Sequence, residues 1–166
     1  MRSVPVLAAL ALLLAPAALA AQAPARESRS PQRAVVVTPG SEVWGPAPAI
    51  LPAGAQLAVL EGDPTKAGSY SMRLRMPDGY RIPPHFHPSD EHVTVVSGTF
   101  QVGMGDRFDA AALKPLPTGS FAMLSPGMRH FARAKGETVI QLHGVGPWSL
   151  SYVNPADALK QEGAHP

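Results

Sequence analysis

The most informative stretch of this sequence is GYRIPPHFHPSDEHVTVVSG, residues 79–98. Side chains of a β-strand alternate between its two faces, so His85 and His87 lie on the same face of an extended segment. The Pro-Ser-Asp sequence that follows is typical of a turn, which lets Glu91 return on the neighbouring strand. Two imidazole nitrogens and a carboxylate oxygen suit a divalent Fe, Mn, Ni, Cu or Zn ion, and a chain without cysteine offers no thiolate. The stretch therefore predicts a metal site.

Length and charge predict one globular domain that does not bind nucleic acid. The 166 residues are enough for a single core without disulfides. The formal net charge is only +2, and the basic residues are scattered between acidic ones rather than clustered. Because recognition of a phosphate backbone depends on a basic patch, we expect no nucleic-acid partner.

The N-terminus predicts export. Arg2 precedes an apolar run over residues 4–20 that ends in Ala-Leu-Ala, which is the layout of a secretory signal cleaved after Ala20. A membrane-spanning helix is the weaker alternative, because the run is short, contains two prolines and has no polar flank after it. We expect a signal peptide at 1–20, a flexible leader at 21–33, and a periplasmic or secreted protein without stable membrane anchoring.

Residues 34–153 have the pattern of a single all-β domain, with short apolar runs interrupted by Pro and Gly. The clearest strand is 70–76, where Tyr, Met, Leu and Met alternate with Ser and Arg. We expect loops at 44–48 and 105–116, with a short helix around 110–113 as the alternative in the second, and a tail at 154–166 with helical turns capped by Asn154. Further strands are expected at 34–38, 56–60, 93–97, 99–104 (paired with 93–97 through a tight turn at Gly98), 120–124, 130–134, 138–144 and 148–153.

With these residues placed, the sequence resembles the cupin superfamily. The first cupin motif is Gly, five residues, His-x-His, three or four residues, Glu, six residues, Gly, and residues 79–98 meet every interval. The second motif is Gly, five residues, Pro-x-Gly, two residues, His, three residues, Asn. Here Gly119, Gly127 and His130 keep their intervals, whereas the proline comes one place late and Ala134 replaces the asparagine. The departure affects the local turn, since the asparagine is not a metal ligand in the family.

The resemblance implies an antiparallel jelly-roll β-barrel, in agreement with the strand pattern. It also implies that His130 joins His85, His87 and Glu91 as the fourth metal ligand. More narrowly, the chain is similar to small exported bacterial single-domain cupins that form a family without a settled activity. Pairing of two chains along a sheet edge is a further expectation from the superfamily.

Three other residues are candidates for contacts around the metal or a substrate: Tyr80, Gln141 and His143. Gln141 and His143 share one face of a late strand. They are candidates for looking into the barrel, but the favoured interpretation is an ordinary half-exposed strand, which has the same alternation. Tyr80 is a candidate hydrogen-bond donor, with core packing as the alternative. His92 follows Glu91 directly and is expected on the opposite face of its strand. The expected apolar lining of the barrel is Met72, Leu74, Met76, Phe100, Val102, Met104, Phe121, Met123 and Phe131.

These features predict a metal-dependent, dioxygenase-like oxidoreductase that acts on a small organic substrate. Fe(II) or Mn(II) is the leading expectation for the metal, with Ni, Cu and Zn as alternatives. Glu91 is the expected catalytic residue, because a carboxylate that tunes the charge of the metal also accepts a proton when it detaches. The alternatives are a non-catalytic module that binds metal or a small ligand, and a metal-assisted isomerase or decarboxylase.

Overall fold

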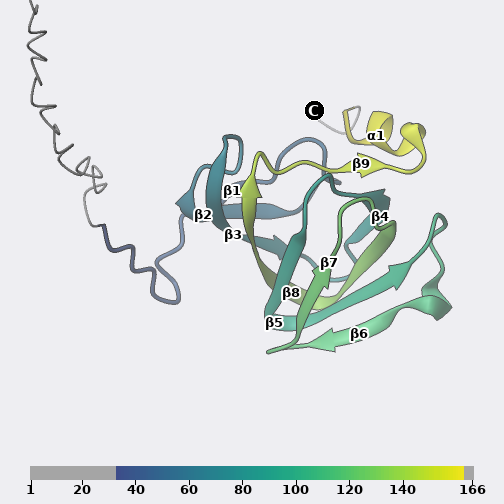
Figure 1. The fold of residues 1–166 in the computed structure, drawn as a ribbon. Coiled ribbons are helices and arrows are strands. Elements are labelled where there is room, and N and C mark those ends of the chain that lie inside the picture. Colours follow the sequence, from purple (N-terminus) through teal and green to yellow (C-terminus); the bar gives the residue numbers. More distant parts are fainter. Residues whose placement is uncertain (1–32, 163–166) are drawn as a thin grey trace, which may run out of the picture. The chain divides into compact units, whose positions relative to one another are not determined.

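A computed structural model describes residues 33–162, so the expected signal peptide and nearly all of the expected leader lie outside the described residues. Within that range the chain forms nine β-strands, one turn of 3-10 helix (η1) and an α-helix (Figure 1). No helix in the same range has the length and apolar character needed to cross a bilayer. The bounds are β1 Gly45–Pro46, β2 Gln56–Gly62, β3 Gly68–Met76, β4 Arg81–Phe86, β5 Glu91–Met104, η1 Ala110–Ala112, β6 Lys114–Pro117, β7 Phe121–Leu124, β8 His130–Gly146, β9 Ser151–Tyr152 and α1 Pro155–Glu162.

Strand β8 organises the sheet, because its 17 residues reach three partners. One edge of β8 pairs antiparallel with β5 over most of its length. The other edge pairs first with β4, next to His130, and then with β3. The sheet continues from β3 to β2 and β1 and from β4 to β9, while β6 and β7 pair with β5. This all-β antiparallel arrangement is the expected jelly-roll barrel, and it brings the ends of β4, β5 and β8 together.

Strand β3 confirms the expected alternation. Tyr70, Met72, Leu74 and Met76 are buried, whereas the serine and arginines between them are partly exposed. The Arg75 guanidinium lies 3.9 Å from the centre of the Trp44 ring, so the outer face is covered by a cation–π contact. The inner face of β3 is therefore core, as the sequence indicates.

The expected hairpin at Gly98 is wrong, because residues 91–104 form the single strand β5. Gly98 has a φ angle of 76°, and the register against β8 shifts on both sides of it. A side chain at this position would collide with the backbone of Glu137 and Thr138. The glycine thus permits a bulge in a continuous strand rather than a reversal of the chain. The two strands expected at 130–134 and 138–144 are likewise one, β8.

Three other local predictions are wrong for a common reason, which is that strand formation depends on a partner. Residues 34–38 form no strand, and the side chain of Val36 is 82% exposed. The proline-rich segment 44–48 contains β1, which pairs with β2. The expected loop 105–116 contains the start of β6, which pairs with β5, whereas η1 lies where a short helix was the alternative. The expected capped helix is present, since the Asn154 side chain accepts a hydrogen bond from the Ala156 backbone N–H at 3.1 Å.

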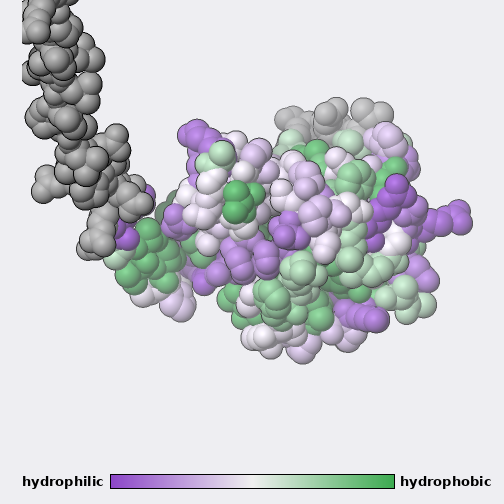
Figure 2. Space-filling view, viewed as in Figure 1, coloured by the Kyte–Doolittle hydropathy of each residue, from purple (hydrophilic) through white to green (hydrophobic). Residues whose placement is uncertain are grey.

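Most of the expected apolar lining is buried, but Met104, Phe121 and Met123 are 55%, 58% and 51% exposed. Phe121 and Met123 on β7 stand opposite Thr94 and His92 of β5. Directly opposed residues of antiparallel strands share a face, so Phe121 and Met123 lie on the outer face of the barrel together with His92. Figure 2 shows apolar surface over β5 and β7, in agreement with this placement.

Candidate metal centre

Four side chains of the sequence motifs meet inside the barrel. His85 lies near the end of β4, His87 follows that strand by one residue, and Glu91 and His130 are the first residues of β5 and β8. His85 and His130 are direct cross-strand partners. The side chains are buried, with 3% exposure for His85 and 9% for Glu91, the most exposed of the four. The structure therefore brings together residues that are up to 45 positions apart in the sequence.

Each of the three histidines is fixed in one tautomer by the backbone. A carbonyl oxygen only accepts hydrogen bonds, so a ring nitrogen facing one must carry the hydrogen. In all three rings that nitrogen is Nδ1, which leaves the lone pair on Nε2. The Nδ1 atoms donate to Pro83 O from His85 at 2.7 Å, to Ser149 O from His87 at 2.7 Å, and to Met128 O from His130 at 2.9 Å.

The lone pairs converge. His85, His87 and His130 each offer one ligand atom, and these three atoms all lie within 4.8 Å of one another. The Glu91 carboxylate joins them, with one oxygen 3.4 Å from His87 Nε2 and the other 3.4 Å from His130 Nε2. Within residues 33–162, His87 Nε2 is a buried atom without a hydrogen-bond partner. A buried carboxylate facing nitrogen lone pairs is stable only when a cation or proton lies between them, so the residues fit a divalent metal.

The pKa shifts of His85 and Glu91 favour the protonation states in which these two residues can bind a metal ion. Burial, together with positive charge on the neighbouring imidazoles, lowers the pKa of His85 to about 3. Burial alone would raise the pKa of Glu91, but the facing imidazoles of His130, His87 and His85 outweigh it, so that pKa is lowered. His85 is thus a neutral nitrogen donor and Glu91 an anionic oxygen donor, which matches the ligand preferences of Fe, Mn, Ni, Cu and Zn.

The four side chains line a small cavity of about 20 Å³, enough for a water-sized molecule. Apart from the histidines and Glu91, the side chains around this cavity are apolar or aromatic. This lining excludes bulk water and strengthens electrostatic interactions inside. The apolar and aromatic lining residues are Leu51, Leu74, Ile82, Phe100, Ala132, Ile140, Leu142, Trp148 and Leu150.

Gln141 and His143 do not look into the barrel, which agrees with the interpretation of an ordinary half-exposed strand. Ile140 and Leu142 are 2% and 3% exposed and line the cavity, so alternation along β8 places Gln141 and His143 on the other face. Gln141 accepts a hydrogen bond from Arg73 Nε at 3.2 Å. The His143 ring stacks on the ring of His92 at 5.0 Å, so His92 also faces outward, as expected.

Tyr80 is buried but lies outside the lining of the histidine cavity. Its hydroxyl donates a hydrogen bond to Pro52 O at 2.5 Å, and the pKa of the phenol is raised by burial and by Tyr152. Leu51, next to Pro52, lines the cavity, so this hydrogen bond holds the segment that carries Leu51. The buried position agrees with core packing, one of the two sequence-based alternatives for Tyr80.

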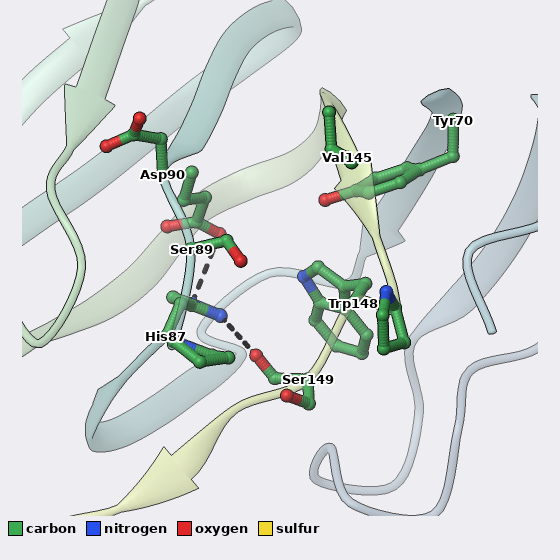
Figure 3. A pocket seen from close by; sticks show the side chains of 10 residues that line it. Tyr70, His87, Ser89, Asp90, Val145, Trp148 and Ser149 are labelled. Carbon is green, nitrogen blue, oxygen red and sulfur yellow. Dashed lines mark hydrogen bonds and ion pairs between the residues drawn. The ribbon is translucent and has the colours of Figure 1, made fainter. Parts of the chain in front are cut away.

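Sequence reasoning missed Trp148 and Ser149, which lie between β8 and β9. Figure 3 shows the His87 ring facing the Ser149 backbone, with the Trp148 indole beside it. The centre of the Trp148 ring is 6.0 Å from that of His87. Ser149 follows His87 by 62 residues. Every residue has a backbone carbonyl, so the residue type at this position could not indicate the contact. Only the isolated tryptophan after Gly146-Pro147 was a readable signal.

Comparisons with known proteins agree with this architecture. A family model described as the ChrR cupin-like domain matches residues 32–149. Among solved structures, a candidate acetylacetone dioxygenase from Methylibium petroleiphilum has a TM-score of 0.58 and 19% identity, covering 78% of this chain and 87% of that one. Among curated proteins, no sequence matches.

Two further solved structures are similar at lower identity. An RmlC-like cupin from Shewanella frigidimarina has a TM-score of 0.51 and 16% identity, over 66% of this chain and 87% of that one. The polyketide cyclase RemF from Streptomyces resistomycificus has a TM-score of 0.51 and 14% identity, over 60% of this chain and 71% of that one. These likenesses show the fold alone. Since the family match spans most of the sequence and the strand arrangement agrees with it, the chain belongs to the ChrR cupin-like domain family, within the cupin superfamily.

Proposed function

We propose that this protein is a metal-dependent, dioxygenase-like oxidoreductase that acts on a small organic substrate. One observation carries the proposal: three imidazoles with Nε2 lone pairs and the Glu91 carboxylate converge in a buried, apolar cavity. Side chains that serve only to stabilise a fold have no reason to bury an uncompensated acceptor cluster, because its desolvation costs free energy. A site that must hold a cation accepts that cost for function.

In this proposal His85, His87, His130 and Glu91 hold the metal. When bound, Fe(II) or Mn(II) supplies Lewis acidity and a redox couple for a small organic substrate and dioxygen. The backbone carbonyls that hold each Nδ1–H fix the rings in orientation, which is the usual role of hydrogen-bond partners behind metal ligands. The apolar lining keeps bulk water away from the reacting groups.

Glu91 is the proposed catalytic residue. Its lowered pKa keeps the carboxylate ionised near neutral pH, and its two oxygens face two different imidazoles. A carboxylate in this position reduces the net charge of the centre and accepts a proton from a substrate bound beside it. In the described part of the chain, no other carboxylate lines the histidine cavity.

One observation favours a second candidate, a non-catalytic module that binds metal or a small ligand. The cavity lining offers no acid or base besides the four proposed ligands, so proton transfer would depend on Glu91 alone. A metal-assisted isomerase or decarboxylase shares the same site without a need for oxygen. The three candidates therefore differ in turnover and in oxygen use rather than in metal content.

The test is an oxygen-consumption assay on protein stripped of metal and reconstituted with Fe, Mn, Ni or Cu. Catechols and small dicarboxylates are the trial substrates, and product analysis under nitrogen detects isomerisation or decarboxylation. We expect oxygen uptake with Fe or Mn and a loss of at least about 100-fold in Glu91→Gln. His143→Ala, an outer histidine, is the matched control. Substrate turnover without oxygen uptake supports the isomerase or decarboxylase, and no turnover with any metal supports the binding module.

We also propose that the mature protein is periplasmic or secreted, on the strength of the signal-like residues 1–20. N-terminal sequencing of the protein purified from its natural source tests this. A mature chain beginning near Ala21 is expected, and an intact N-terminus on cytoplasmic material contradicts it.

A further inference from the structure

A second, larger hollow lies next to the histidine cavity. It has a volume of about 380 Å³, within the range of pockets that bind small organic molecules. Several of its apolar side chains are held open to solvent, including Val59 at 47% and Ile50 at 39% exposure. We call this hollow the outer groove, and its lining residues are Pro48, Ile50, Leu57, Val59, Asp63, Pro64, Thr65, Met72, Trp148, Ser149 and Leu150.

Asp63 and Thr65, polar side chains at the rim of the outer groove, already have hydrogen-bond or ion-pair partners within the chain. Asp63 accepts hydrogen bonds from the Thr65 backbone N–H at 2.9 Å and from the Thr65 hydroxyl at 2.6 Å. The Lys66 ammonium lies 2.7 Å from the other oxygen of Asp63. No free charge in the described rim is left to select an ionic ligand, so the groove suits the apolar part of a molecule.

Trp148 borders both the outer groove and the histidine cavity. It lines both, and it also lines the pocket beside Tyr70 and Asp90 that Figure 3 shows. Its backbone N–H is anchored to Pro64 O at 2.7 Å, whereas its side chain belongs to a segment outside any strand. Among the described residues, Leu150 is the only other one that lines both the groove and the histidine cavity.

The indole N–H of Trp148 is a buried donor without a partner among the described residues. Because this donor has no such partner, rotation of the ring away from its present position breaks no hydrogen bond. The same donor is available to an oxygen atom of a ligand that enters from the groove. The neighbouring Ser149 carbonyl holds the His87 ring at 2.7 Å, so the segment connects the groove to the proposed metal ligands.

We propose that the outer groove binds the apolar part of a small organic substrate, and that Trp148 is the gate through which its oxygen-bearing head reaches the histidine cavity. The inference rests on the proposed function and adds a substrate class to it. That class is molecules with an apolar tail and an oxygen-bearing head. The histidine cavity holds only a water-sized molecule with Trp148 in place, so the head enters when the indole moves.

The first test compares catechol with 4-hexylcatechol by calorimetry on Mn-loaded protein under nitrogen. Burial of the hexyl chain in the groove should make 4-hexylcatechol bind at least about tenfold more tightly than catechol. Val59→Asn should abolish this difference while leaving catechol binding unchanged. Val43→Asn is the matched control, because Val43 is 87% exposed and lies outside the groove. Equal affinities for the two catechols in the parent would overturn the inference.

A second measurement separates failure of the groove from failure of the proposed function. Trp148 is the only tryptophan left in Trp44→Phe, so its emission reports on the groove directly. In the metal-free form of this variant, 1-octanol should shift the emission, and Val59→Asn should remove the shift. If catechol does not bind the metal-loaded protein but octanol shifts the emission, the groove stands and the proposed function falls. Absence of the shift counts against the groove whatever the metal site does.

The gate is tested by the association rate of catechol in stopped-flow experiments. Trp148→Ala should raise the association rate constant by about tenfold, since the ring no longer has to move. Trp148→Phe keeps an aromatic barrier without the N–H, so it should associate slowly and dissociate faster than the parent. An unchanged association rate in Trp148→Ala, with folding verified by circular dichroism, would overturn the gate.

Discussion

The inner and outer faces of this barrel hold the same residue type in opposite circumstances. Inside, His85, His87 and His130 are buried, each is held by a backbone carbonyl, and a carboxylate faces them. Outside, His92 and His143 form a stacked pair at 5.0 Å with an interplanar angle of 17°, partly exposed on the face that also bears Phe121. A candidate metal site therefore needs ring nitrogens that converge in fixed tautomers, and the proximity of two rings is not sufficient.

The largest expected effect comes from removing inner histidines. In the double variant His85→Ala, His87→Ala, the metal content should fall from about one ion per chain to less than about a tenth of that. The outer double variant His92→Ala, His143→Ala should keep the parent content. Elemental analysis of the purified proteins checks both. Equal metal content in the inner variant and the parent would remove the distinction between the faces.

The next effect is a loss of stability of the metal-free protein in acid. Burial and the neighbouring imidazoles lower the pKa of His85 from 6.5 to about 3, so the unfolded chain binds this proton at a higher pH than the folded chain does. Stability therefore falls as the pH drops from about 6.5 toward 3, and the lowered pKa of Glu91 acts in the same direction at lower pH.

Thermal unfolding of the metal-free protein between pH 7 and pH 4 measures this loss. His85→Gln removes the titrating group, so its unfolding temperature should depend less steeply on pH. A parent protein whose unfolding temperature stays constant over that interval is inconsistent with a buried neutral His85.

A smaller effect is expected from the segment that closes the inner site. The Tyr152 hydroxyl donates to Ile50 O at 2.6 Å, beside the Tyr80 bond to Pro52 O, and together they hold the chain on both sides of Leu51. Tyr152→Phe should lower the free energy of unfolding by about 1 kcal/mol in urea titrations, because the Ile50 carbonyl loses its donor. Burial and Asp157 raise the pKa of Tyr152 to about 12, so in the parent this stabilisation is lost as the pH rises from 10 toward 12. An unchanged free energy in Tyr152→Phe would show that the bond adds nothing.

The smallest effect is expected on the outer face. His143→Ala should change the free energy of unfolding by no more than about 0.5 kcal/mol, since it removes a half-exposed stacking contact without opening the core. Urea titration measures this change. A loss above about 2 kcal/mol would mean that the outer histidines have a structural role comparable with that of the core.

The inner site was partly readable from the sequence because its first three members are local. His85 and His87 share a face by strand alternation, and Glu91 follows a turn, so seven residues of sequence contain the geometry. His130 was different. It meets His85 through the register of β4 against β8, which no local pattern contains, and it was assigned through the family motif. The Ser149 carbonyl and Trp148 depend on the path of the chain after β8 and were missed.

The errors have the same origin. The alternation of residues 140–143 was right, but the inward face is set by the partner strand, where Val95 and Val93 of β5 stand opposite Ile140 and Leu142. Gly98 and the proline-rich segments were read from local turn chemistry, whereas long-range pairing allowed strands to continue or form there. Local patterns therefore predicted the fold class and the ligand types, and tertiary pairing determined which residues face the site.

The most direct test of the central claim is X-ray absorption spectroscopy of the protein loaded with one equivalent of Zn(II), whose coordination by nitrogen and oxygen is well defined. Three imidazole nitrogens and one carboxylate oxygen are expected at about 2.0–2.2 Å, with the imidazole signal lost in the His85→Ala, His87→Ala variant. A spectrum of oxygen ligands alone, or one that is the same in the parent and the variant, would contradict it.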